Sequence, residues 1–139
     1  MLLICMISVF QLANALDYAR LWQISVEKDL HVAGEQKLTP DKYILAKFNT
    51  LEFKLLQATI PVEQSGLTEI ISLPDPQGNE MRFRIFECPM MEKELADKYP
   101  QIKTYTAISV DNPAVTAKLD FTVFGFHAKI FNGSETYFI

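Results

Sequence analysis

The stretch FRIFECPMMEKELADKYPQIKTY (residues 83–105), with DNPAVTAKLDFTVFGFHAKI (residues 111–130), decides the fold predicted for this chain. From Val115 to Val123 apolar and polar residues alternate, which is the two-residue period of a strand with one buried and one solvated face. The first stretch reads as a strand, a short helix between two prolines and another strand. Neither stretch contains a catalytic motif.

Turn residues separate further strands on both sides of this region. The sequence PDPQGN (residues 74–79) lies between Glu69–Leu73 and Glu80–Glu87, and its Pro and Gly residues predict a β-hairpin. Phe124-Gly125 and Asn132-Gly133 predict two more turns, so the C-terminal part reads as a β-meander. The last strand runs to the final residue without a stop signal, which predicts that the architecture continues beyond it.

Two short helices complete the predicted elements. The first spans Thr50–Ala58, begins with an Asn49 cap and stops before Pro61. Its residues at helical spacing predict an apolar stripe that packs on the sheet, formed by Leu51, Leu55 and Ala58. The second helix is predicted to open at Pro89, with Met91, Leu95 and Tyr99 stacked at intervals of four. The fold class is therefore α+β, mostly antiparallel sheet.

The N-terminal residues predict export. Residues 1–15 are apolar and uncharged and end in Ala-Asn-Ala, a pattern that signal peptidase accepts, so we expect a signal peptide rather than a lasting membrane span. Residues 16–38 are expected to form an extended lead-in anchored by Leu21 and Trp22. Residues 39–139 are expected to form a single domain. The predicted location is the cell envelope or the medium.

Composition excludes some functions. The chain has 139 residues, 49% of them hydrophobic, which is enough for one core. Its net charge of −4 provides no basic field of the kind that nucleic-acid binding needs. The 2 histidines, His31 and His127, have no paired metal-ligand spacing, so neither metal nor cofactor is expected. No nucleophile or phosphate-loop motif is present, and the chain reads as a non-enzyme.

Candidate contact residues for a partner remain. Arg82 and Arg84 share a strand face that Lys118 and Lys129 would extend, although solvated strand faces often carry such charges. Cys88 would be the single cysteine after signal removal. As a thiolate it would silence a partner's catalytic zinc, but a half-buried position at a strand end is the expected reading. The candidates for partner contact are Arg82, Arg84, Cys88, Tyr99 and His127.

The order ISLPDPQGNEMRFRIFECPMMEKELADKYPQIKTY, then DNPAVTAKLDFTVFGFHAKIF, resembles the N-terminal propeptide-like region of secreted, reprolysin-like zinc metallopeptidases of Bacteroidetes-type bacteria. The ELADKYPQIK and GFHA segments carry the resemblance most specifically. It implies export and a downstream catalytic domain with an HExxHxxGxxH zinc motif, which this sequence lacks, so no zinc ligand or catalytic residue is transferred. Cys88 departs from the small residue expected in relatives.

These observations lead to a functional hypothesis with alternatives. The resemblance implies a non-catalytic, propeptide-like domain that helps a metallopeptidase catalytic domain fold, or covers its cleft, in cis or in trans. A binding or adhesion module of the cell envelope is the alternative, and an exposed aromatic patch on the outward sheet face, for example Phe86, Phe124 and Phe131 together, would favour it. An enzyme would need a pocket with converging carboxylates, which the sequence does not predict.

Overall fold

The computed structural model describes residues 20–25 and 42–139. The predicted signal segment, the rest of the lead-in and His31 lie outside the described residues. The strands are β1 (Trp22–Ser25), β2 (Leu45–Phe48), β3 (Glu69–Pro74), β4 (Glu80–Glu87), β5 (Lys103–Ser109), β6 (Thr116–Thr122), β7 (Gly125–Asn132) and β8 (Glu135–Phe138). The helices are α2 (Thr50–Gln57), the short 3₁₀ helix η2 (Glu63–Ser65) and α3 (Lys93–Lys98).

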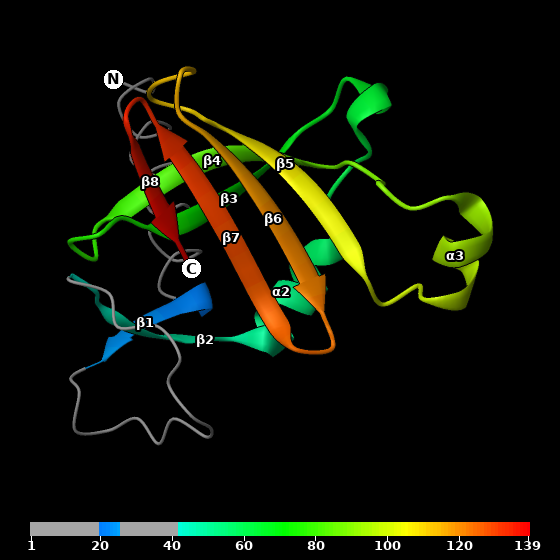
Figure 1. Cartoon of the computed structure of the whole chain (residues 1–139), viewed down its shortest axis with the longest axis horizontal. Helices are drawn as coiled ribbons and strands as arrows, with labels where there is room; N and C mark the ends of the chain where they lie inside the picture. The colour runs from blue at the N-terminus through cyan, green and yellow to red at the C-terminus, as the bar shows by residue number, and fades with distance from the viewer. Residues whose placement is uncertain (1–19, 26–41) are drawn as a thin grey trace, which may run out of the picture.

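A six-stranded antiparallel sheet forms the body of the protein. Its strands follow one another in chain order from β3 to β8, and β1 pairs with β2 in a separate two-stranded sheet. Figure 1 shows α2 and the β1–β2 pair on one face of the large sheet, while α3 projects on the connection from β4 to β5. The predicted α+β class, with a hairpin, a C-terminal meander and two short α-helices, is confirmed. Within the described parts of the chain, no helix is long and apolar enough to cross a membrane.

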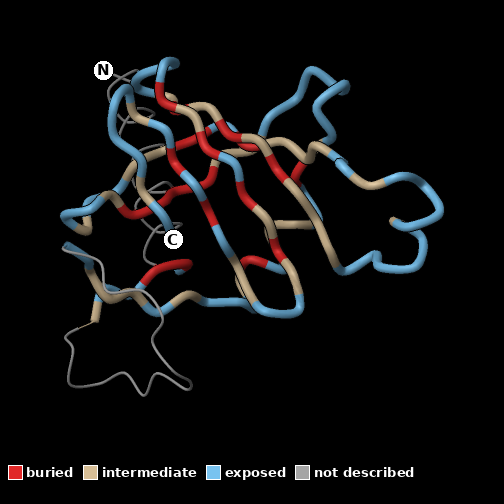
Figure 2. The backbone as a smooth tube through the Cα atoms, in the orientation of Figure 1, coloured by how far each residue is buried: buried red, intermediate tan, exposed pale blue. Residues whose placement is uncertain are grey.

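The core lies between the large sheet and the elements on its inner face, and buried stretches recur at alternate positions along the strands (Figure 2). Phe53 of α2 is fully buried at its centre. Four aromatic rings surround it, with centroids 5.1 to 6.2 Å from its own: Phe48, Tyr105, Phe121 and Phe126. Such contacts add to the free energy gained from burying apolar area.

The β1–β2 unit is tied to the sheet by hydrogen bonds as well as by apolar contact. The indole N–H of Trp22 donates to the carbonyl oxygen of Ser72 at 2.8 Å, and the Trp22 ring lies 4.8 Å from that of Phe48. The backbone N–H of Asn49 donates to the Leu21 carbonyl at 2.9 Å. Leu21 and Trp22 are both buried, which confirms them as anchors.

Helix α2 begins as predicted but buries a different face. The Asn49 side chain accepts from the Glu52 N–H at 3.3 Å, which is the expected cap. The predicted apolar stripe is wrong, because Leu51 and Leu55 are 69% and 62% exposed and Ala58 is also exposed. The large ring of Phe53 takes the sheet-facing side, and Leu56 lies three residues further on the same side and packs against the core.

Helix α3 is shorter than predicted and begins later. It starts at Lys93 after Glu92, whose extended backbone serves as the cap, so Pro89 does not open it. The pairing of β4 with β5 extends as far as Cys88, whose N–H donates to the Thr104 carbonyl at 2.9 Å. Because the backbone is still extended at this point, the helix begins several residues after Pro89. No α3 residue is buried, so the stack expected at intervals of four does not form a packed face.

The β3–β4 turn depends on a glycine and an aspartate. Gly78 has a φ of 85°, a conformation that side chains with a Cβ rarely adopt. The Asp75 carboxylate accepts from the backbone N–H groups of Gln77 and Asn79, each at 2.8 Å, and from the Asn79 side-chain amide at 3.0 Å. Burial acts to raise the pKa of Asp75, but the hydrogen bonds, with the Asn79 amide first among them, lower it. The turn predicted from PDPQGN is therefore present and internally bonded.

The buried face of α2 makes a direct prediction about stability. Phe53→Ala should lower the free energy of unfolding by about 3–5 kcal/mol, because it removes a buried ring that four other rings contact. Leu51→Ala, on the exposed face of the same helix, should change it by less than about 0.5 kcal/mol. Urea denaturation followed by circular dichroism measures both, and equal losses in the two variants would contradict the observed helix orientation.

Tyr105 gives a second prediction, based on pH. Burial raises the pKa of Tyr105 from 10.0 to about 12, although the Gln57 amide donates to its hydroxyl oxygen at 2.8 Å and opposes the shift. The unfolded chain ionises this phenol near its ordinary pKa, so its stabilising contribution is complete below that value and is lost as the pH rises through the folded pKa. The stability of Tyr105→Phe should therefore fall less steeply than that of wild type at alkaline pH. Parallel slopes in urea denaturation would contradict this.

Candidate binding surface

The outer face of the large sheet, opposite the core, is solvated and unevenly charged. Strand pairing places its side chains in cross-strand rows. One central row contains Phe86, Thr106, Lys118, Lys129 and Phe138, and the next contains Ile70, Arg84, Ile108, Thr116, Phe131 and Thr136. We call these two rows the basic face, because their charged residues are all cations: Arg84, Lys118 and Lys129.

Two of these cations are directly opposed. Lys118 on β6 pairs with Lys129 on β7, and like charges opposite each other destabilise a sheet. Their ammonium groups are directed to different neighbours. Lys118 Nζ donates to Thr106 Oγ1 at 2.7 Å, whereas Lys129 Nζ lies 5.1 Å from the Phe131 ring centre and 5.3 Å from that of Phe138. These contacts replace the carboxylate partner that neither lysine has among the described residues.

Aromatic residues at one side of the basic face are open to solvent. Phe138 is 74% exposed and Phe131 is 37% exposed, and both belong to the rows that contain the cations. Phe86, at the opposite end of its row, is half-buried. The basic face therefore offers both charge and apolar area to a ligand.

Carboxylates border the basic face but are already engaged. His127 Nδ1 and Asp120 Oδ1 are 2.9 Å apart across β6 and β7, and Arg82 Nη2 lies 2.9 Å from Asp111 Oδ1. Asp111 is therefore paired with an arginine, and Asp120 is in contact with the His127 ring. The three cations of the basic face therefore form no ion pair with these two residues.

The structure separates the residues predicted to contact a partner. Arg84 and His127 share the outer face, and Arg82 is paired with Asp111 at its margin. Cys88 is half-buried at the end of β4, as expected, and its carbonyl accepts from Thr104 Oγ1 at 2.6 Å. Tyr99 lies apart from them at the end of α3.

Sequence reasoning named both lysines and Phe131, but it missed Phe138, the second ring beside Lys129. Lys129 and Phe131 are two residues apart on one strand, so alternation alone predicts a shared face. The contact with Phe138 depends on the pairing of β7 with β8, which the strand sequences alone do not specify.

The two edges of the large sheet differ. On β3, the Ser72 carbonyl accepts from Trp22, the Ile70 N–H donates to Glu69 Oε1 at 3.1 Å, and Pro74 has no N–H to offer. Directly after β8, Ile139 exchanges two backbone hydrogen bonds of 2.9 Å with Ala128. The alternation of the ladder then directs the N–H and C=O groups of Thr136 and Phe138 away from β7. These groups close the β3 edge, whereas no described residue pairs with the outward groups of β8, which we call the open edge.

Tyr137 fixes β8 from the inner side. Its hydroxyl donates to Glu135 Oε2 at 2.6 Å and accepts from the Asn132 amide at 3.1 Å. The hydrogen bond to the Glu135 carboxylate is the main cause that raises the pKa of Tyr137. These bonds and the turn at Gly133 hold the open strand in place.

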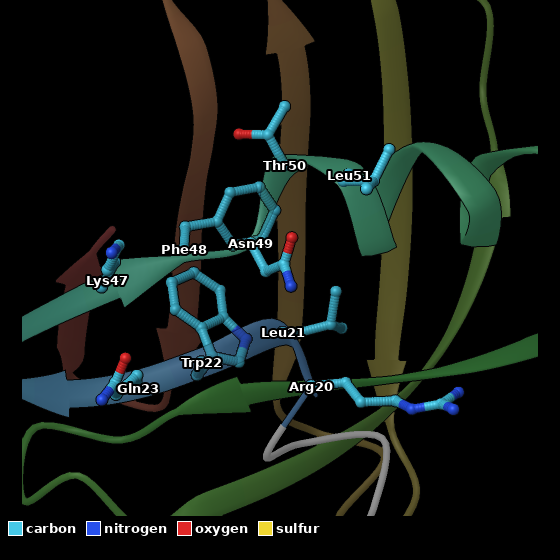
Figure 3. A pocket seen from close by; sticks show the side chains of 9 residues that line it. All are labelled: Arg20, Leu21, Trp22, Gln23, Lys47, Phe48, Asn49, Thr50 and Leu51. Atoms are coloured by element: carbon cyan, nitrogen blue, oxygen red, sulfur yellow. The ribbon is translucent and has the colours of Figure 1, made fainter.

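A hollow of about 510 Å³ lies beside β1, β2 and the start of α2 (Figure 3). It is lined by Arg20, Leu21, Trp22, Gln23, Lys47, Phe48, Asn49, Thr50 and Leu51. The lining contains no Asp, Glu, His or Cys, and Figure 3 shows the Arg20 side chain extending away from Lys47 and Gln23. Its polar groups do not converge on one point, and we assign it no ligand.

Among the residues that the structure describes, no three His, Cys, Asp or Glu side chains are grouped in a way that would hold a metal ion. Comparison with known proteins finds no matching family model, no similar curated protein and no similar solved structure. The resemblance to metallopeptidase propeptides stays a prediction from the sequence. The basic face and the β8 edge are the surfaces from which a function is argued.

The opposed lysines make a prediction about stability. Lys118→Glu places an acid opposite Lys129 and should raise the free energy of unfolding by about 0.2–1 kcal/mol, because it turns repulsion into attraction. Lys118→Gln only removes the repulsion and should have a smaller effect of the same sign. Thermal unfolding at low salt measures the difference, which should shrink at high salt. A destabilised Lys118→Glu variant would contradict the prediction.

Proposed function

We propose that this chain is a non-catalytic, propeptide-like domain of a secreted zinc metallopeptidase system. In this role it assists the folding of the catalytic domain or covers its active-site cleft, in cis or in trans. The proposal includes export through the apolar N-terminal segment. The chain supplies a binding surface, and the zinc chemistry belongs to the partner.

The open β8 edge is the observation that supports this proposal most directly. Thr136 and Phe138 direct backbone donors and acceptors away from β7, while the opposite edge of the sheet is closed by Trp22, Glu69 and Pro74. An open edge can pair with a strand from another chain through main-chain hydrogen bonds. A folding assistant or a cleft cover could engage its partner in this way.

The structure allows a specific experiment. A reprolysin-like catalytic domain from the same organism is refolded with and without the purified chain, and peptidase activity is measured. We expect a higher yield of active enzyme with the chain, and inhibition of the folded enzyme when the chain is in excess. An unchanged yield together with unchanged activity would refute the proposal.

Two variants test the role of the edge. Thr136→Pro removes an N–H that points away from β7, so the β7–β8 hydrogen bonds are kept while the edge loses a donor. The concentration of Thr136→Pro that gives half of the maximal effect on the peptidase should be about five times the concentration needed with wild type. This is the factor expected for one lost hydrogen bond. Thr136→Ala keeps the N–H and should act like wild type. Equal effects of the two variants would exclude β8 as the contact.

A binding module of the cell envelope is the second candidate. The exposed Phe131 and Phe138 beside Lys129 favour it, because exposed aromatic area on a solvated sheet face is typical of binding surfaces. Retention of the purified chain on isolated cell envelopes, without any peptidase present, would distinguish this function from the first.

A further inference from the structure

The basic face has charge but no counter-charge of its own. Its two rows contain Arg84, Lys118 and Lys129 and no Asp or Glu, although the whole chain has a net charge of −4. The carboxylates of Asp111 and Asp120 at its margins face Arg82 and His127. Among the described residues, cations are therefore concentrated in two adjacent rows of one sheet face, and no carboxylate is paired with them. This concentration points to a partner that supplies the counter-charge.

An anionic group could lie between the ammonium groups of Lys118 and Lys129, which are directed to opposite sides. Lys118 is held toward β5 by its bond to Thr106, and Lys129 lies over Phe131 and Phe138, toward β8. A carboxylate above this cross-strand pair would attract both ammonium groups and offset their mutual repulsion. The exposed rings on the β8 side would then contact apolar side chains that flank the carboxylate.

We infer that the basic face binds an acidic, extended segment of another protein, with its carboxylates over Lys118 and Lys129 and its apolar side chains against Phe131 and Phe138. Alternating acidic and apolar residues complement this mixture of cations and rings. A peptide can also use the adjoining open edge of β8, which a polyphosphate or a lipid surface cannot pair with. This inference requires no metallopeptidase as the partner and stands apart from the proposed function.

The probe is a short fluorescent peptide in which Glu alternates with Val, compared with the same peptide bearing Gln in place of Glu. Fluorescence anisotropy should show binding of the Glu peptide that weakens as salt is added, and much weaker binding of the Gln peptide. Lys118→Gln/Lys129→Gln should weaken binding of the Glu peptide about tenfold, the loss expected for two exposed ion pairs.

A matched control removes two positive charges elsewhere. Lys54→Gln/Lys98→Gln lies on α2 and α3, outside the basic face, and should bind like wild type. Lys118→Gln removes a repulsion, so the binding variant should unfold no earlier than the control, which separates lost binding from lost fold. Equal weakening in both double variants, equal binding of the two peptides, or no binding of the Glu peptide would overturn the inference.

Two competing ligands complete the test. Vesicles with anionic lipids and a sulfated oligosaccharide are added to the bound peptide at matched negative charge. Tighter binding of either one would replace the peptide with a membrane or a glycan as the ligand of this face. If the chain changes the refolding or the activity of a metallopeptidase but does not bind the Glu peptide, the proposed function stands and this inference alone is refuted.

Discussion

The bond from the Trp22 indole to the Ser72 carbonyl connects the two parts of this fold. It anchors the β1–β2 unit to the sheet, brings the Trp22 ring against Phe48 and Phe126, and occupies an acceptor on the β3 edge. A buried carbonyl without a partner costs free energy, so this bond satisfies a group that the fold would otherwise leave open. Trp22 thus helps to cover the inner face of the sheet together with α2, and it closes the β3 edge together with Glu69 and Pro74. Of the sheet surfaces that the described residues form, the outer face and the β8 edge are the ones left uncovered by other described elements.

Much of the sheet could be predicted because its signals are local. Alternation in β6, the Pro and Gly residues of the β3–β4 turn and the Asn49 cap are each determined by neighbouring residues, and the structure contains all three. The buried face of α2 could not be predicted in this way. Leu51 and Leu55 have the right spacing, yet Phe53 fills the space among four rings, three of them more than 50 residues away in the chain. Sequence spacing does not reveal the shape of that space.

The basic face, too, could be predicted only in part from local sequence signals. Alternation assigns Arg84, Lys118 and Lys129 to solvated faces, but only the strand register places the two lysines opposite each other and Phe138 beside Lys129. The repulsion between Lys118 and Lys129 likewise depends on the strand register, because the register sets them opposite each other. Natural sheets often carry surface charges, so the cations alone are weak evidence. Their arrangement without carboxylates, next to exposed rings, makes the surface specific.

The chain order of the strands has a consequence for how the protein folds. Each strand of the large sheet pairs with the next one along the chain, so the sheet can assemble through successive short loop closures, which favours fast folding. The docking of β1 and β2 is different, because the rings that receive Trp22 and Phe48 include Phe126, near the other end of the chain. During synthesis from the N-terminus, Trp22 and Phe48 emerge long before Phe126. Their contacts with that ring can form only after β7 has been made.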